Sequence, residues 1–471
     1  MEEKEGQNKL AAVPVRRLIW KLGLPMVVSM ILQAVYNIVD TVFVINMGGE
    51  EGVVGNLALT YAFPIQLLMI AVGVGTGIGI NALLSRFLGE GKGKLAAKTA
   101  GNGIFLGIVI YAVFLLFGIF GSEWFIRLQA GGNEQAVEMG TTYLRICCVL
   151  SFGCIGFSVY ERFLQSTGKS LYSTAAQIVG ALLNILLDYV FIYPCGWGIA
   201  GAAWATVIGQ IASLAIAMLL HYCKNREIDG SPKYIRPAGK IVAGIYQIGA
   251  SAALMQALLS VMMFGMNLIL GTASSAEVLQ GSFGIYYKIM QFALFAFFGL
   301  SNTIITVLSF NYGLGDPARV KAAIKWGILD SLIAAVAITV LFEALAYPLA
   351  ALFGMASGEA GEEIRSVVVT AIRIAAIGYV FMAFSVAVQG VLQAFRYAIL
   401  PLVISALRLA IVVLPVAWLF TLLPNAADTV WWSLVIAEVV TAAVSAFILA
   451  DVWRKKVLPM RRAEDRPAGR G

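Results

Sequence analysis

The chain has 471 residues, of which 60% are hydrophobic and 13% are charged, and its mean hydropathy is +0.86. A soluble globular domain carries about 25% charged residues, so the composition excludes a soluble fold and predicts a polytopic membrane protein. The net charge of +7 does not indicate nucleic-acid binding, because the basic residues gather in short loops and at the chain ends. One histidine and five scattered cysteines form no Cys/His cluster, which disfavours a histidine-ligated metal site and a serine–histidine hydrolase.

Twelve apolar runs are long enough to cross a bilayer as helices. They are expected at 18–46, 53–79, 94–120, 138–165, 170–193, 198–223, 241–270, 277–308, 318–343, 364–392, 397–421 and 428–453. The connector at 224–240 is basic and contains Pro232 and Pro237, as is typical of a linker. We therefore expect an N-terminal six-helix lobe at 1–223, a linker at 224–240, a C-terminal six-helix lobe at 241–453 and a basic tail at 454–471.

The distribution of charge predicts the orientation of these spans. If the N-terminus lies in the cytoplasm, nearly all Lys and Arg residues of the loops fall on the inner side, and only Arg127 and Arg365 fall in outer loops. A shift by one helix would destroy this segregation, which follows the positive-inside rule. The sequence thus predicts a multi-pass protein of the plasma membrane, with the linker and both termini in the cytoplasm.

The two sets of six spans repeat one another. Residues 75–91 align with residues 299–315 at an offset of 224, and Arg145-Ile146 recurs as Arg373-Ile374 at an offset of 228. Because six is an even number, the repeats are parallel and related by an axis along the membrane normal. The predicted fold is an all-α polytopic membrane protein, with twelve transmembrane helices in two six-helix lobes related by a pseudo-twofold axis. Such a bundle encloses a midplane cavity in transporters, and a duplicated scaffold without transport is the alternative.

The first span has one polar face. Gln33, Tyr36, Asn37 and Asp40 are spaced i, i+3, i+4 and i+7, so they project from one side of an otherwise apolar helix. A carboxylate at this depth costs about 2.5–3.5 kcal/mol unless it is paired or protonated. Asp40 therefore needs a partner or a proton, whereas Gln33, Tyr36 and Asn37 are candidates for contacts with cargo. Pro25 lies in the same span and permits either a bend or a static kink.

The fifth and sixth spans contain partners for Asp40. Asn184 and Asp188 are one helical turn apart, and Thr206 is expected at a similar depth. Two carboxylates, an amide and a hydroxyl suit a small hard cation, and without a metal ion the carboxylates must share or gain protons. Two separate packing carboxylates are the alternative. The corresponding positions of the second half are apolar, namely Met266, Val412 and Val416. We therefore expect one ion site per molecule.

At this point the chain resembles a known family. Residues 22–44 resemble the first helix of multidrug and toxic compound extrusion (MATE) transporters, and residues 75–91 and 299–315 resemble that family's paired motifs. The resemblance covers about residues 14–455 and implies a V-shaped pair of six-helix lobes. It also implies export of organic, often cationic compounds in exchange for Na⁺ or H⁺, with Pro25 as a hinge.

The resemblance extends to the ion site. In the family branch with an N-lobe site, an Asp on the first helix joins an Asn, an Asp and a Thr on the fifth and sixth helices. Asp40, Asn184, Asp188 and Thr206 match this pattern, which implies that they bind the coupling cation and serve as metal ligands if that cation is Na⁺. Other branches use acids on the seventh and tenth helices, and the expected spans 241–270 and 364–392 contain none.

The seventh and eighth spans hold further candidates for a cargo cavity. Met262 and Met266 would give adaptable apolar walls for lipophilic cations, and packing in a core is the alternative. Tyr287 and Lys288 lie together in the eighth span. A Lys inside the membrane must face a cavity or an acid, and Asp330 is the candidate acid for a purely structural pair.

One buried ion pair is expected in the second half. Arg408 and Glu438 fall at similar depths in the neighbouring eleventh and twelfth spans. A charged side chain within a span needs a partner, so a structural ion pair is the favoured interpretation.

These features predict a secondary active antiporter, not an enzyme, that exports organic, often cationic or lipophilic compounds in exchange for Na⁺ or H⁺ by alternating access. Its partners are small organic cations or lipophilic drugs and the lipid bilayer, with no nucleic acid and no organic cofactor, and we expect a monomer. The alternative is a flippase for lipid-linked saccharide or another lipid, although such proteins usually present more cavity cations than these spans carry. An intramembrane enzyme with the two aspartates as a dyad has no supporting catalytic motif.

Overall fold

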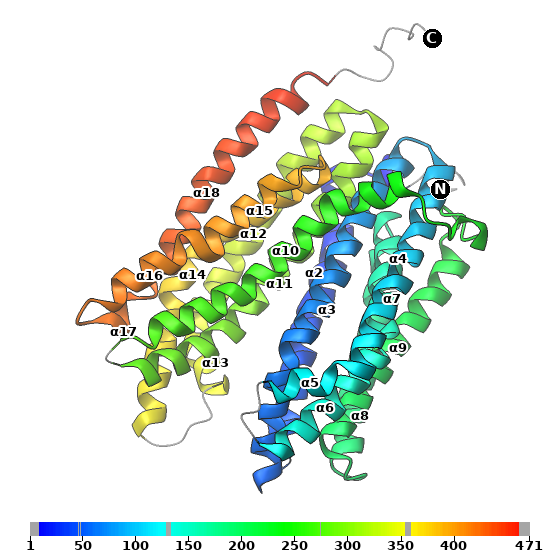
Figure 1. The fold of residues 1–471 in the computed structure, drawn as a ribbon. Coiled ribbons are helices and arrows are strands. Elements are labelled where there is room, and N and C mark those ends of the chain that lie inside the picture. The colour runs from blue at the N-terminus through cyan, green and yellow to red at the C-terminus, as the bar shows by residue number, and fades with distance from the viewer. Residues whose placement is uncertain are drawn as a thin grey trace, which may run out of the picture. The chain divides into compact units, whose positions relative to one another are not determined.

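The computed structural model describes residues 9–45, 47, 49–128, 133–273, 275–353 and 359–460. Within these ranges some side chains are not described, including those of Tyr36, Asn37 and Asp40. The roles predicted for these three side chains therefore lie outside the described part of the protein. All regular elements in the described ranges are helices, most of them long (Figure 1).

The first half of the chain holds ten of these helices. They are α1 (Lys9–Ala12), α2 (Val15–Ile45), α3 (Gly49–Gly89), α4 (Gly93–Phe120), α5 (Ser122–Arg127), α6 (Glu134–Val149), α7 (Phe152–Ser166), α8 (Ser170–Ile192), α9 (Gly198–Lys224) and the short η1 (Pro232–Tyr234).

The second half follows the same order of long helices. It contains α10 (Gly239–Leu270), α11 (Ala276–Leu314), α12 (Pro317–Ala344), α13 (Ala346–Phe353), α14 (Glu359–Ala394), α15 (Ile399–Ala406), η2 (Leu407–Ile411), α16 (Val413–Thr421), α17 (Ala426–Thr429), α18 (Trp432–Val452) and η3 (Trp453–Val457).

The number of membrane spans agrees with the sequence. Ten helical segments in the described ranges are long and apolar enough to cross a membrane, and α6 with α7, bent by 41°, makes an eleventh. The 31-residue α2 is a further long helix that begins and ends close to the expected first span. With α2 included, each of the twelve expected spans overlaps a helix of the described ranges, although α3 continues ten residues beyond the expected end at 79 and α11 six residues beyond that at 308. The prediction of an all-α polytopic membrane protein is confirmed.

The repeated glycine motif has a structural reason. Gly91 and Gly315 stand at equivalent positions in the two copies of the motif, just after α3 and α11, and both have a left-handed backbone with φ of +69° and +74°. Only glycine adopts this conformation without a steric penalty, so it ends a helix readily. After Gly315 the Asp316 side chain accepts hydrogen bonds from the backbone N–H groups of Ala318 and Arg319, which starts α12.

The contacts divide the chain into two compact units. One is built on Leu24–Ala253, and the other joins Pro14–Gly23 to the chain from Leu254 onward. This division differs from the predicted boundary in the linker at 224–240. The start of α2 belongs to the C-terminal unit, and the start of α10 belongs to the N-terminal unit.

Close helix packing explains where the start of α10 lies. A Cβ atom on Gly79 of α3 would lie 2.1 Å from the carbonyl oxygen of Ile245, and one on Gly75 would lie 2.6 Å from that of Gly249. The absence of side chains lets the backbones of α3 and α10 approach one another. Such a contact depends on tertiary structure, so the boundary could not be read from local composition.

The start of α2 makes polar and aromatic contacts within the C-terminal unit. The guanidinium carbon of Arg16 lies 4.2 Å from the ring centre of Trp326 on α12, which is a cation–π contact. Asp330, one turn further along α12, is buried beside Arg16 and Trp20. Lys288 is exposed. Asp330 thus lies beside residues of α2, rather than forming the Lys288 pair that the sequence left open.

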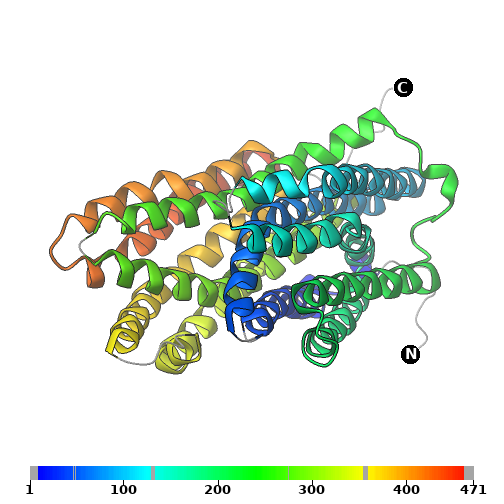
Figure 2. The ribbon, with the colours of Figure 1, turned by 60° about the horizontal axis from the view of Figure 1, so that its bottom comes forward.

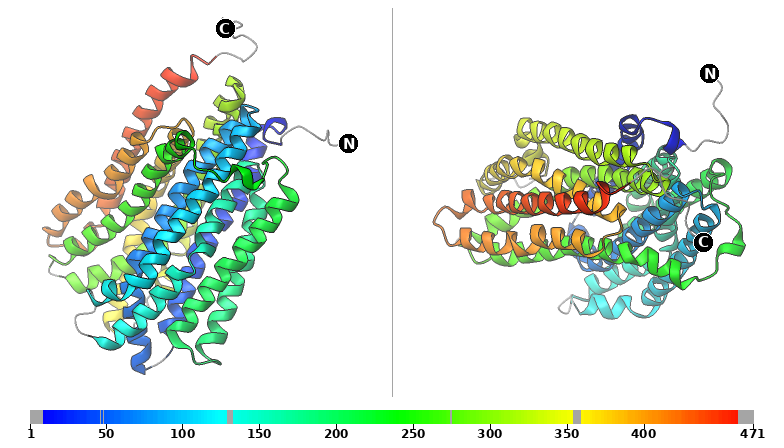
Figure 3. Two further views of the ribbon diagram at one scale, coloured as in Figure 1. Left: turned by 45° about the vertical axis from the view of Figure 1, so that its right-hand side comes forward. Right: turned by 90° about the horizontal axis from the view of Figure 1, so that it is seen from above.

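Each unit has an apolar interior and an apolar surface. In the N-terminal unit α8 packs along α9, and in the C-terminal unit α11 packs along α14 (Figures 2 and 3). Large apolar side chains also point outward, such as Phe120 and Phe447, each 78% exposed. An apolar surface of this extent is unusual in water but is solvated by lipid chains.

Candidate functional site

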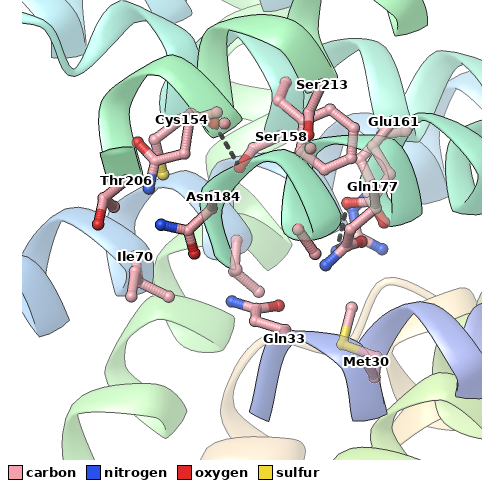
Figure 4. A pocket seen from close by; sticks show the side chains of 17 residues that line it. Met30, Gln33, Ile70, Cys154, Ser158, Glu161, Gln177, Asn184, Thr206 and Ser213 are labelled. Carbon is pink, nitrogen blue, oxygen red and sulfur yellow. Dashed lines mark hydrogen bonds and ion pairs between the residues drawn. The ribbon is translucent and has the colours of Figure 1, made fainter. Parts of the chain in front are cut away.

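A cavity lies inside the N-terminal unit among α2, α3, α7, α8 and α9 (Figure 4). Its space for water-sized molecules is about 70 Å³, and one water needs roughly 10–15 Å³ on this measure, so several waters fit. The polar residues that line it are Gln33, Ser158, Glu161, Arg162, Gln177, Asn184, Thr206, Gln210 and Ser213. A polar, hydrated cavity inside a membrane helix bundle is a candidate binding site.

Two residues of the predicted ion site line this cavity, and a third lies next to it. Asn184 and Thr206 are in the lining, and Asp188 is fully buried one turn beyond Asn184 on α8. The Asn184 Nδ2 group donates a hydrogen bond to Asp188 Oδ2 at 3.0 Å. The i, i+4 spacing therefore produces the contact that it predicts. The Asp40 side chain is outside the described residues, so its approach to this group stays a prediction.

The amide of Asn184 is only half satisfied. Its Oδ1 atom is buried and accepts no hydrogen bond from the described residues, whereas Figure 4 shows the side chain pointing into the cavity from the wall opposite Gln33. A buried orphan acceptor calls for a water or an ion. An amide oxygen beside a carboxylate suits a hard cation such as Na⁺, and the carboxylate alone suits a proton.

The composition of the site limits which metal it suits. The described side chains include no group of three or more His, Cys, Asp or Glu residues that could bind a metal. The Thr206 hydroxyl donates to the Ala202 carbonyl at 2.9 Å within its own helix. Oxygen ligands of this kind disfavour Zn²⁺ and other metals that prefer nitrogen or sulfur.

Side-chain contacts connect α2 to α8 around Pro25. The Thr174 hydroxyl donates to the Pro25 carbonyl at 2.7 Å, and the Ser29 hydroxyl donates to Gln177 Oε1 one turn later. In this structure α2 runs through Pro25 as one helix. A bend at Pro25 would either break these hydrogen bonds or require α8 to move together with α2. The role of Pro25 as a hinge stays a prediction.

An ion pair at one end of the cavity was missed in the sequence. Glu161 and Arg162 of α7 are both buried, and Arg162 Nη2 lies 3.7 Å from Glu161 Oε2. Gln165 connects them, since its Nε2 donates to Glu161 at 2.9 Å and its Oε1 accepts from Arg162 Nη1 at 2.7 Å. Gly77 makes room, because a Cβ there would lie 3.1 Å from Arg162 Cγ. The available signal was two adjacent charges inside an apolar span.

The cavity residues predicted on the seventh and eighth spans lie in the C-terminal unit. Met262 lines a second, smaller cavity of that unit. Met266 and Tyr287 are buried in its apolar core, and Lys288 is exposed. These last three residues line neither of the two cavities, and their part in cargo binding stays a prediction.

The second cavity contains the ion pair expected between the eleventh and twelfth spans. Arg408 Nε and Glu438 Oε1 are 3.8 Å apart, and the side chains are 3% and 13% exposed, respectively. The similar depths of these residues in the sequence were therefore a correct indication that they meet.

Comparison with known proteins agrees with this architecture. The family model described as MatE matches residues 25–190 and again residues 251–419, which reproduces the internal repeat. The multidrug export protein MepA of Staphylococcus saprophyticus is 25% identical over 429 residues, covering 91% of this chain and 92% of that protein.

Solved structures show the same fold. An outward-facing multidrug resistance MATE family transporter of the MOP superfamily is 23% identical with a TM-score of 0.88, covering 96% of this chain and all of that one. A MOP superfamily transporter from Pyrococcus furiosus Vc1 is also 23% identical, with a TM-score of 0.87 and coverage of 97% and 100%. The two family matches span well over half of the sequence. The chain therefore belongs to the MatE family, and it is a multi-pass membrane transporter rather than an enzyme.

Proposed function

We propose that this protein is a secondary active antiporter that exports organic, often cationic or lipophilic compounds in exchange for Na⁺ or H⁺. One observation carries the proposal: Asp188 is fully buried on a membrane helix, and Asn184, its hydrogen-bond partner, lines a cavity with room for several waters. An ionisable group in such a place is costly and is most readily explained by ion binding. Export as the direction of transport is supported by the similarity to a multidrug export protein.

Coupling requires that ion and cargo favour different states of the protein. Asp188 and Asn184, together with Thr206 and Asp40, would hold the coupling cation, which supplies the charge that neutralises the carboxylates. Burying ionised carboxylates costs much more desolvation free energy than burying carboxylates whose charge a bound cation neutralises. The ion-bound and ion-free sites therefore stabilise different helix arrangements. A ligand with equal affinity for both states would shift nothing.

The charge of the cavity argues against the flippase alternative. The lining contains one acid, Glu161, and one base, Arg162, which interact with each other and with Gln165. A site for a diphosphate needs several free cations. The Glu161–Arg162 pair has no net charge and is surrounded by amides and hydroxyls, which suits an organic cation better. Such a cation can replace Arg162 as the counter-charge of Glu161.

We further infer that the protein lies in the plasma membrane as a monomer, with both termini and the linker in the cytoplasm. The cytoplasmic placement of the termini and the linker rests on the segregation of Lys and Arg among the loops.

The decisive experiment replaces Asp188 with Asn in proteoliposomes loaded with a fluorescent organic cation. Under separately imposed Na⁺ and H⁺ gradients, the wild-type protein should respond to one of them. Asp188→Asn should lower ion-driven efflux by about tenfold or more, the size expected for the loss of a typical coupling energy. The matched control is Asp451→Asn, because Asp451 is an exposed carboxylate near the end of α18. Full ion-driven efflux by folded Asp188→Asn protein would refute the assignment.

A further inference from the structure

The C-terminal unit contains a small cavity that the proposed ion site does not use. It lies among α10, α11, α14, η2, α16 and α18, and its space for water-sized molecules is about 30 Å³. One water needs roughly 10–15 Å³ on this measure, so about two waters fit, and a drug-sized molecule does not. The wall is mostly apolar, with Met262, Met290 and Met382 among its residues.

The polar part of the wall is the ion pair of Arg408 and Glu438. Its 3.8 Å separation is too long for a hydrogen bond. Glu438 Oε2 and the Nε and Nη1 groups of Arg408 are buried and have no hydrogen-bond partner among the described residues. A buried group left without a hydrogen-bond partner destabilises the fold, and more so when it is charged. The cavity next to these atoms has room for a water that would bridge them.

The backbone around Arg408 is also unusual. Residues Leu407–Ile411 form a π-helical turn, in which the Val412 N–H donates to the Leu407 carbonyl at 3.0 Å. Such turns are rare and occur most often at functional sites, because they insert one residue and change the direction of the side chains. Here the turn separates α15 from α16 and includes the buried Arg408.

The surroundings of Glu438 select its ligand. The titratable groups that face it in the described structure are Arg408 from η2, Tyr286 from α11 and Tyr379 from α14, whereas α10 contributes only Leu259 and Met262. A metal cation needs several oxygen ligands and would be repelled by the permanent charge of Arg408. A proton needs only one lone pair and a water to deliver it.

We propose that Glu438 is a proton-binding residue of the C-terminal unit, reached through the water of this cavity, and that its protonation is linked to cargo occupancy. This inference rests on the proposed antiport function. A proton from the bulk solution is relayed by a cavity water, which gives one proton to the free lone pair on Oε2 and takes up another. The water is thus unchanged, and a neutral acid replaces the negative charge opposite Arg408. The guanidinium keeps its charge and must find other partners, so the two protonation states favour different arrangements around η2.

The test is a titration of the purified full-length protein in liposomes by infrared difference spectroscopy, between about pH 5 and pH 9, the range that spans neutral pH. A protonated carboxyl absorbs separately from a carboxylate. The wild-type protein should gain an acid band as the pH falls, Glu438→Gln should lack it, and Asp451→Asn should keep it. Saturating tetraphenylphosphonium should shift the midpoint to lower pH by about one unit, a tenfold change in proton affinity.

Each result decides the role of Glu438. If the band persists in Glu438→Gln, Glu438 does not bind the proton, the pair is structural and the proposal is wrong. If Glu438→Gln lacks the band but the wild-type midpoint ignores the cation, Glu438 binds a proton without linkage to cargo, which also overturns the proposal. If Glu438→Gln does not fold, Glu438→Gln combined with Arg408→Met removes both charges, and a buried pair replaced in this way commonly keeps its stability. The titration is read without transport, so its failure is independent of the outcome of the Asp188→Asn experiment.

Discussion

At the scale of single residues, the main polar feature of each of the two cavities is a pair of oppositely charged side chains. Each unit contains one cavity beside an acid–base pair, Glu161 with Arg162 in one and Arg408 with Glu438 in the other. Among the described residues, the first pair is bridged by the amide of Gln165 and leaves Arg162 Nε without a hydrogen-bond partner, whereas the second has no such bridge and leaves Glu438 Oε2 and the Nε and Nη1 groups of Arg408 without one. An ion pair that is bridged by a hydrogen-bonded amide is suited to a fixed structural or binding role. An ion pair without such a bridge is suited to a change of protonation state.

The bridged pair makes a prediction about stability. Glu161→Gln should destabilise the protein by about 3–5 kcal/mol, because it leaves Arg162 buried without a counter-charge. The double variant Glu161→Gln/Arg162→Met should recover most of this loss, since no charge is then left unpaired. Thermal unfolding in detergent measures both. Equal destabilisation by the single and double variants would show that the attraction between the two charges is unimportant.

Sequence patterns predicted some side-chain contacts and missed others for identifiable reasons. Asn184 and Asp188 meet because a spacing of four residues on one helix fixes their relation locally. Arg162, near the end of the expected span 138–165, is only 1% exposed. Two adjacent charges inside an apolar span were the available signal, but the room for Arg162 is made by Gly77 of another helix, which the α7 sequence does not contain.

Glycine governs packing at the scale of whole helices. The repeated motif at the end of α3 contains Gly75 and Gly79, whose missing side chains let α10 pack against α3. The lengths and positions of the spans followed from hydropathy alone, because every backbone group in lipid must be satisfied within its own helix. Which helices pack against one another depends on the shapes of their surfaces, and the hydropathy of the sequence gives no information on these shapes.

The α3–α10 contact gives an element-scale prediction. In Gly79→Ala the added methyl would lie 2.1 Å from the Ile245 carbonyl oxygen, a backbone atom that cannot rotate away. We expect a loss of about 1–3 kcal/mol, as is typical of overpacking, measured by thermal unfolding in detergent. Gly73→Ala is the matched control on the same helix, since its methyl would meet the Ser158 hydroxyl at an ordinary 3.5 Å. Equal stability of both variants would contradict the assigned contact.

The duplication governs the molecule as a whole, and the two halves are no longer equivalent. The family model matches both halves, and the long helices follow the same order. The aspartate and asparagine of the N-terminal site correspond to apolar residues in the second half, where Arg408 and Glu438 appear instead. Two copies of one scaffold have thus acquired different buried charges, consistent with a separate task for each unit.

The exchange of helix starts described above makes the two halves dependent on one another for folding. A break in the linker near residue 230 would leave Pro14–Gly23 on one polypeptide and the rest of its folding unit on the other, and the same is true in reverse for residues 239–253. Neither fragment should accumulate when it is expressed alone. Co-expression should restore both, detected as a co-purifying pair of fragments. Stable accumulation of a single fragment would mean that the borrowed segment is dispensable, so the duplicated protein would retain the autonomy of its single-repeat ancestor.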